Sequence, residues 1–242
     1  MAKAVSNSKR ALATLLLAAL ASCVPRPPSP TPPIGGFPAD FPSSFYSTVP
    51  REDAFRIVPS RSKLTVKVYR SGPLASLGHN HVIVSREVDG FVYLADDMSK
   101  ARADLFAPVA GFIVDDAAER TAAGSDYATQ PTASDIEGTR ANMLGPKLLN
   151  AQQWPFVVVH VVPTHVGPES TQVALSITVR DHVATVPVDV HWQRTGSELT
   201  METTFNVDHV TLGLEPFSTL GGALRVADQI SLSVSITART AR

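Results

Sequence analysis

The chain has 242 residues, of which 44% are hydrophobic and 18% charged, and its formal net charge at pH 7 is −1. This length can supply one sizeable hydrophobic core, and the near-neutral composition without a basic cluster argues against binding to nucleic acid or electrostatic adhesion to an anionic lipid surface. The sequence contains no phosphate loop, dinucleotide fingerprint, Gly-x-Ser-x-Gly elbow or His-Glu-x-x-His helix, so it does not indicate an enzyme of those classes.

Residues 1–22 have the pattern of a secretory signal. Three basic residues precede a short apolar run, 11–21, and the run leads into Leu20-Ala21-Ser22-Cys23. As a helix the run covers about 16 Å, too little for a hydrocarbon core of about 30 Å. The ending resembles the lipobox of bacterial lipoproteins, whose cysteine becomes the acylated first residue. Cys23 is the only cysteine, so we expect lipidation there, the alternative being cleavage elsewhere and a chance thiol.

Residues 23–50 are rich in proline, which favours polyproline II or disorder, and we expect a lipid-anchored linker. Four aromatic residues are unusual in a spacer, so the second half is expected to pack on the domain: Phe37, Phe41, Phe45 and Tyr46. Removal of the signal with its three basic residues takes the formal charge to about −4. Val24, rather than Asp, follows the cysteine, which resembles lipoproteins sorted to an outer membrane. We therefore expect a bacterial envelope protein anchored in the outer membrane and facing the periplasm.

Residues 51–242 are expected to form one domain whose dominant hydrophobic period is two, the pattern of half-buried antiparallel strands. Alternation is clearest at 64–68, 173–179, 186–192, 199–207 and 230–236, and 156–162 is apolar on both faces. Shorter strands are expected at 54–58, 81–86, 90–95, 101–106 and 110–114. Val88-Asp89-Gly90 predicts a hairpin turn between two of these strands.

One stretch departs from this period. Ser134 and Glu137 have the spacing of a capping box, which predicts a helix that continues to Leu144 and ends at Gly145. Pro146 is expected to open a second short turn before the chain returns to strand. Eight or more antiparallel strands with this short helical insertion predict an all-β fold closed into a barrel, which holds side chains or one small apolar ligand. The expected lining is Leu64, Val66, Leu175, Ile177, Val188, Trp192 and Phe205.

Several segments, in order, resemble the YceI-like family of polyisoprenoid-binding, lipocalin-like proteins. They are Phe55-Arg56-Ile57 with Ser62-x-Leu64-x-Val66, Asp89-Gly90-Phe91, the stretch from Asp135-Ile136-Glu137 to Trp154-Pro155, and Leu212 to Ser218 followed by Gly222-Ala223-Leu224 and Val226-Ala227-Asp228. The resemblance implies a lipocalin-like antiparallel β-barrel and an isoprenoid-like apolar lipid ligand. Two features depart from the family pattern: Asp181-His182 replaces a usual glycine, and the loop from Gly72 to His81 is longer and richer in histidine.

The acid–histidine pairs Asp181-His182 and Asp208-His209 are not expected to be catalytic, because neighbours on a strand point to opposite faces. We interpret them as a polar turn and a solvated strand end.

His79-Asn80-His81 is the one polar feature with possible chemistry. In an extended chain the two Cα atoms lie about 6.5–7 Å apart, close enough for both histidines to bind one metal. Zinc needs further ligands, and the sequence does not place the other candidates: His160, His165, His191 and His209. We expect instead that His79 and His81 shape the barrel mouth and hydrogen-bond the polar head of a ligand, with no metal or cofactor.

The sequence therefore predicts a non-enzymatic, lipid-anchored envelope protein that binds a long apolar molecule: a polyisoprenoid, an isoprenoid quinone or a fatty amide. Two alternatives remain, a metal-binding envelope protein that uses His79 and His81, and a structural domain with a filled interior.

Overall fold

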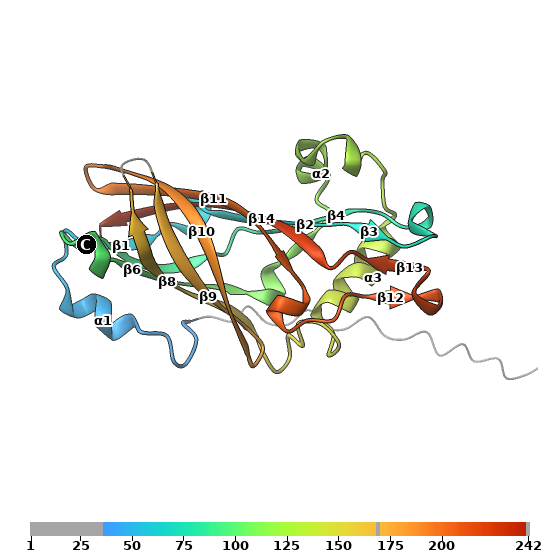
Figure 1. The fold of residues 1–242 in the computed structure, drawn as a ribbon, viewed down its shortest axis with the longest axis horizontal. Coiled ribbons are helices and arrows are strands. Elements are labelled where there is room, and N and C mark those ends of the chain that lie inside the picture. Colours follow the sequence, from blue (N-terminus) through green and yellow to red (C-terminus); the bar gives the residue numbers. More distant parts are fainter. Residues whose placement is uncertain (1–35, 168–169, 241–242) are drawn as a thin grey trace, which may run out of the picture. The chain divides into compact units, whose positions relative to one another are not determined.

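Antiparallel strands dominate the computed structural model, which describes residues 36–167 and 170–240 (Figure 1). The strands are β1 (Ala54–Ile57), β2 (Lys63–Val68), β3 (Arg70–Ser71), β4 (His81–Ser85), β5 (Asp89–Tyr93), β6 (Arg102–Pro108), β7 (Ile113–Val114), β8 (Phe156–Val166), β9 (Thr171–Val179), β10 (His182–Thr195), β11 (Glu198–Asp208), β12 (Ser218–Thr219), β13 (Leu224–Val226) and β14 (Gln229–Thr240). The helices are α1 (Ser43–Thr48), α2 (Ala117–Ala123) and α3 (Ala133–Leu144). None of these helices is long and apolar enough to cross a membrane.

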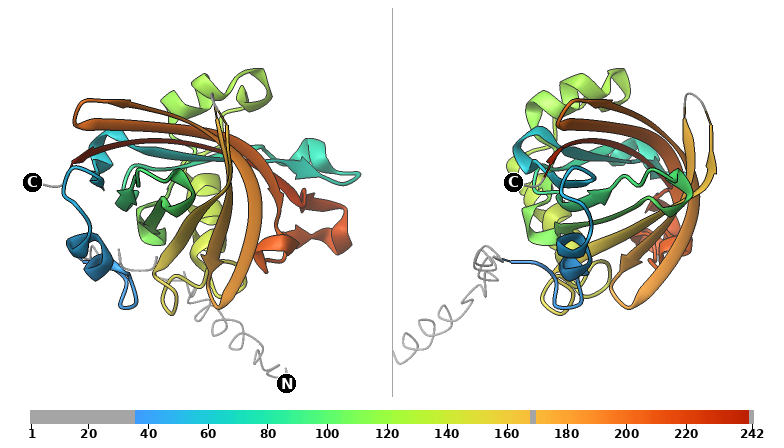
Figure 2. Two further views of the ribbon diagram at one scale, coloured as in Figure 1. Left: turned by 60° about the vertical axis from the view of Figure 1, so that its left-hand side comes forward. Right: turned by 90° about the vertical axis from the view of Figure 1, so that its left-hand side faces the viewer.

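The main sheet closes into an eight-stranded antiparallel barrel, which confirms the predicted fold class. Its order is β1-β5-β6-β8-β9-β10-β11-β14, and pairing of β14 with β1 closes the ring. Figure 2 shows how strongly the long strands curve to form the barrel wall. Closure removes the free sheet edges that an open sheet of this size would expose.

At three places around the barrel the chain forms two strands in the same row, separated by a short break. β2, β4 and β7 extend β1, β5 and β6 towards the same end, where β2 also pairs with β14. Within the described strands, β7 pairs with β4 and with no strand on its other side, and α3 packs against it there. The helical insertion thus covers the end at which the sheet is incomplete.

Two local predictions were wrong in detail. Asp89 and Gly90 lie inside β5 and not in a turn. Gly90 has φ 143°, and a Cβ there would overlap the backbone carbonyl of Asp104, so glycine serves close strand approach. The capping box of α3 is formed by Thr132 and Asp135, two residues before the predicted pair. The helix does end at Leu144, as predicted.

The segment before β1, residues 36–50, packs on the outer face of the barrel. Phe41 and Tyr46 are buried, and the Tyr46 ring stacks on Phe91 of β5 with centroids 4.9 Å apart. The Tyr46 hydroxyl donates a hydrogen bond of 2.5 Å to Asp104 of β6. The second half of the expected linker is therefore folded onto the domain, because its aromatic side chains pack there. The signal, Cys23 and the first part of the linker lie outside the described residues.

Candidate ligand cavity

The interior of the barrel contains a cavity of about 210 Å³ with an almost wholly apolar wall, which we call the apolar chamber. Side chains from β2, β5, β6, β8, β9, β10, β11 and β14 line it. The indole of Trp192 faces this space, and its N–H donates to the Thr171 hydroxyl at 3.1 Å. That hydrogen bond satisfies the indole within the barrel, so the tryptophan offers the chamber an apolar face.

A second cavity of about 280 Å³, the histidine chamber, lies towards the end covered by α3. Its wall combines apolar side chains from the strands and α3 with His79, His81 and His209. The two chambers adjoin, since both are lined by Leu64, Val157, Ile177 and Leu232. Together they have the scale of small-molecule sites, which are commonly about 300–1,000 Å³.

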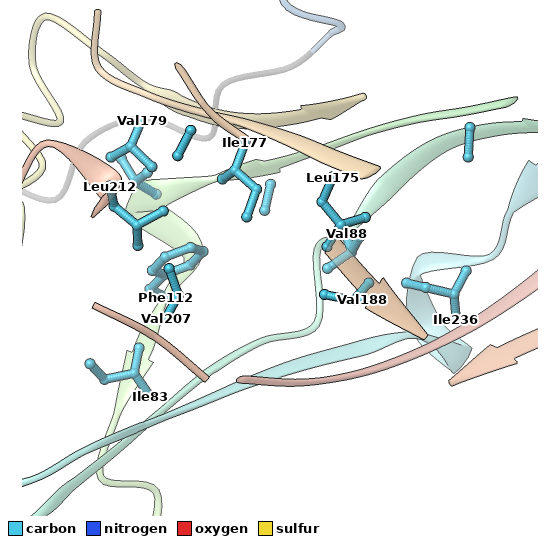
Figure 3. Close-up of a cluster of buried hydrophobic side chains, with 14 of the residues drawn as sticks. Ile83, Val88, Phe112, Leu175, Ile177, Val179, Val188, Val207, Leu212 and Ile236 are labelled. Atoms are coloured by element: carbon cyan, nitrogen blue, oxygen red, sulfur yellow. The ribbon is translucent and has the colours of Figure 1, made fainter. Parts of the chain in front are cut away.

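The predicted lining residues divide between the chambers. Leu175, Trp192 and Phe205 line the apolar chamber, Val66, His79 and His81 line the histidine chamber, and Leu64 and Ile177 border both. Val188 is buried, with 5% of its surface exposed, but is not part of either wall. Figure 3 shows Val188 among the buried hydrophobic side chains, near Leu175 and Val88. Period-two alternation identifies the inward face of a strand but not which inward side chains border empty space.

A buried charged network fixes His81. Its Nδ1 lies 2.6 Å from Oδ2 of Asp115, and Arg120 Nη1 donates to the other carboxylate oxygen at 2.6 Å. The Val82 amide donates to that same oxygen at 3.0 Å. Burial acts to raise the pKa of Asp115, but the hydrogen bonds from His81, Val82 and Arg120 outweigh it, so the pKa lies below its usual value. A carboxylate on Nδ1 orients the imidazole and leaves Nε2 for other partners.

Arg120 belongs to α2, which the sequence pattern did not predict. Asp116 caps this helix by accepting from the amides of Ala118 and Glu119. The Arg120 guanidinium also donates to the carbonyl oxygens of Asn80, Tyr127 and Thr129. One buried cation thus holds both the helix and the His79–His81 stretch, and no local sequence motif predicted this interaction.

His209 was wrongly interpreted as part of a solvated strand end, because only 6% of its surface is exposed. Its Nδ1 lies 2.6 Å from the backbone carbonyl oxygen of Asp228. A carbonyl only accepts, so Nδ1 carries the proton and Nε2 is the other hydrogen-bonding atom. By contrast, Asp181 does lie in a turn, the one between β9 and β10, and His182 is the first residue of β10. Nε2 of His182 lies 3.0 Å from the carbonyl oxygen of Thr211.

The His79 and His81 rings have centroids 6.4 Å apart. Nδ1 of His79 is buried and has no hydrogen-bond partner among the described residues. Within the described ranges, no three side chains of His, Cys, Asp or Glu are grouped closely enough to hold a metal ion.

Similar barrels occur in solved structures. BcnA of Burkholderia cenocepacia matches with a TM-score of 0.53 and 13% identity over 75% of this chain and 98% of that one. A polyisoprenoid binding domain from Saccharophagus degradans, implicated in plant cell wall breakdown, matches with a TM-score of 0.53 and 9% identity over 77% and 98%. No protein-family model matches this chain, and no curated protein matches its sequence. At such low identity the likeness shows a shared fold.

Proposed function

We propose that this protein binds one long, apolar lipid-like molecule in its barrel as part of a lipoprotein anchored in the bacterial envelope. The apolar chamber carries the proposal, because an almost wholly apolar space enclosed by a barrel selects hydrocarbon. Burial of each CH₂ contributes about 0.8 kcal/mol, so a long tail supplies affinity without a charged site. The YceI-like sequence segments and the fold shared with a polyisoprenoid binding domain support the same ligand class.

The histidine chamber indicates how the bound molecule is oriented in the barrel. It adjoins the apolar chamber and presents ring nitrogens of three histidines, with the Nδ1 positions of His81 and His209 already engaged. We infer that the tail of the ligand occupies the apolar chamber and that its hydroxyl, carbonyl or amide meets these histidines. A polyisoprenoid, an isoprenoid quinone or a fatty amide has this construction.

The direct test is mass spectrometry of an organic extract of the purified protein. The expected result is one class of long-chain lipid, together with binding of an added polyisoprenoid or fatty amide to lipid-stripped protein. Protein that repeatedly yields no lipid and binds neither compound would refute the proposal, as expected for a domain with a structural role alone.

Removal of both loop histidines tests the polar end. The double variant His79→Ala, His81→Ala is expected to bind a fatty amide about 1–3 kcal/mol more weakly, because two hydrogen bonds to the head group are lost. Its affinity for a hydrocarbon of equal length should stay near that of the wild type, by isothermal titration. His182→Ala, outside both chambers, is the control. If the native protein contains stoichiometric zinc or copper, and the double variant loses both the metal and thermal stability, the histidines bind a metal instead.

The proposed anchor has its own test. Cys23→Ser removes the thiol at which we expect acylation. Stable attachment needs more than one acyl chain, so this variant is expected to remain as unprocessed precursor or to be released as mature protein into the soluble fraction. Membrane fractionation and the mobility of metabolically labelled protein measure this. Thr31→Ala, in the same segment, should fractionate like the wild type. A Cys23→Ser protein that behaves like the wild type would show that acylation at this cysteine is wrong.

A further inference from the structure

A small three-stranded sheet, β12-β13-β3, lies at the end of the barrel that contains the histidine chamber, and its loops project there in Figures 1 and 2. We call residues 70–78 and 217–226 the tip. Its two halves are joined by strand pairing of β3 with β13 and by the Leu74 amide, which donates to the Ala223 carbonyl at 2.9 Å. Gly72 lies against the same Ala223 backbone, so the two loops form one unit.

The tip exposes large apolar side chains. Leu77 is 66% exposed, Leu220 63%, Phe217 48% and Leu74 37%. Single exposed apolar residues are ordinary, but a group of them on one projecting unit is typical of a surface that contacts protein or membrane.

The backbone at Leu220 adds a second observation. Leu220 has φ 50°, a left-handed conformation that is uncommon for a bulky residue, and it precedes Gly221 and Gly222, which also have positive φ. Glycine would adopt the Leu220 conformation without strain. With 63% of its surface exposed, Leu220 has little burial within the fold to offset this strain, which points to a contact outside the chain.

The charge of the tip selects the partner. Arg70 and Arg225 belong to the tip, and neither half contains Asp or Glu. Both arginines also border the histidine chamber, whose described wall contains no carboxylate. The chain as a whole carries a small negative charge, but the tip is a local cationic and apolar surface beside the histidine chamber.

We propose that the tip docks on an anionic lipid bilayer. Leu77 and Leu220 enter the interface between head groups and acyl chains, and Arg70 and Arg225 face the lipid phosphates. This contact brings the histidine chamber, whose wall includes Arg70 and Arg225, to the bilayer surface, where a lipid passes between membrane and barrel. Docking depends on the surface alone and does not require that the cavity be filled.

Vesicle co-sedimentation of the chain from residue 23 onward, carrying Cys23→Ser so that no acyl chain contributes, tests this proposal. Vesicles of phosphatidylcholine are compared with vesicles that also contain phosphatidylglycerol. Each arginine is expected to strengthen partitioning to the anionic vesicles by about fivefold, so Arg225→Gln should weaken it by that factor and have little effect on neutral vesicles. The variant Leu77→Ser, Leu220→Ser should weaken binding by about tenfold or more.

Val166→Ser is the matched control, because Val166 is 42% exposed at the end of β8 and lies outside the tip. Circular dichroism and thermal unfolding verify that each variant is folded. Equal binding to neutral and anionic vesicles, no binding by the parent chain, or unchanged binding by the leucine variant would each overturn the proposal. Concentration-dependent dimers in ultracentrifugation that the leucine variant abolishes would identify a second copy as the partner and would overturn it as well.

Discussion

Replacement of Arg120 by alanine is expected to lower the free energy of unfolding by about 3–5 kcal/mol, the largest loss of stability that we predict. The Arg120 side chain is 1% exposed and that of Asp115 is fully buried, so the substitution leaves a buried carboxylate without its permanent cation. It also leaves the carbonyls of Tyr127 and Thr129 without their donor. Because α2 and the His79–His81 stretch share this cation, both should loosen in the variant.

Chemical denaturation measures the loss. Arg239→Ala is the control, because Arg239 is 60% exposed in its pair with Glu198, and its removal should cost less than about 1 kcal/mol. If Arg120→Ala is no more destabilising than this control, the network does not hold α2 to the barrel.

The same network makes a prediction about pH. The pKa of Asp115 in the folded protein lies below 3.8, its ordinary value, because hydrogen bonds from His81, Val82 and Arg120 outweigh the opposing effect of burial. Its contribution to stability is therefore complete above the ordinary value and is lost as the pH falls through the lower, folded value. In Arg120→Ala this contribution is smaller, so the difference in stability from the wild type should narrow below about pH 3.8.

Substitution of Leu175 by tryptophan is expected to lower lipid recovery strongly while the protein remains folded. Leu175 lines the apolar chamber, and a larger ring there occupies space that the tail of the ligand needs. Overpacking of a filled core costs about 1–3 kcal/mol. Here the ring extends into a cavity, so the free energy of unfolding should fall by about 1 kcal/mol or less. Lipid recovered per mole of protein, by mass spectrometry, should fall at least about tenfold, which corresponds to about 1.4 kcal/mol.

Two further tryptophan variants make this result specific. Val188→Trp places the same ring where no cavity borders the side chain, so it should destabilise the protein by about 1–3 kcal/mol. Val183→Trp, at a position that is 58% exposed, should change neither stability nor lipid recovery. A Leu175→Trp protein that retains its full lipid complement would place the ligand elsewhere.

Where local chemistry decides structure, the sequence was informative. Alternating residues such as Val173, Leu175, Ile177 and Val179 predict β9 because every second side chain must face the core, and all four are buried. The C-terminal end of α3 was also predicted correctly from neighbouring residues. Its start was predicted two residues too late, because Thr132-x-x-Asp135, which forms the cap, has the same spacing as Ser134-x-x-Glu137.

The candidate site depends on residues that are distant in the sequence. Asp115 meets His81 across 34 residues, and Arg120 meets the carbonyl of Asn80 across 40. No periodicity encodes such pairs, because they exist only after the strands and α2 have packed. For the same reason the sequence did not place His209 in the chamber wall.

By itself, then, the sequence determined a series of antiparallel strands with a short helical insertion, because period-two burial and helix termination act between near neighbours. Closure of the barrel depends on pairing of β1 with β14, which lie at opposite ends of the domain sequence. It also indicated which strand faces are apolar. Only the tertiary structure decided that the barrel encloses two adjoining chambers, since packing can equally fill or leave space between inward side chains. The tertiary structure also brought the loops at 72–78 and 219–223 together beside the histidine chamber, because strand pairing of β3 with β13 joins segments that the chain separates.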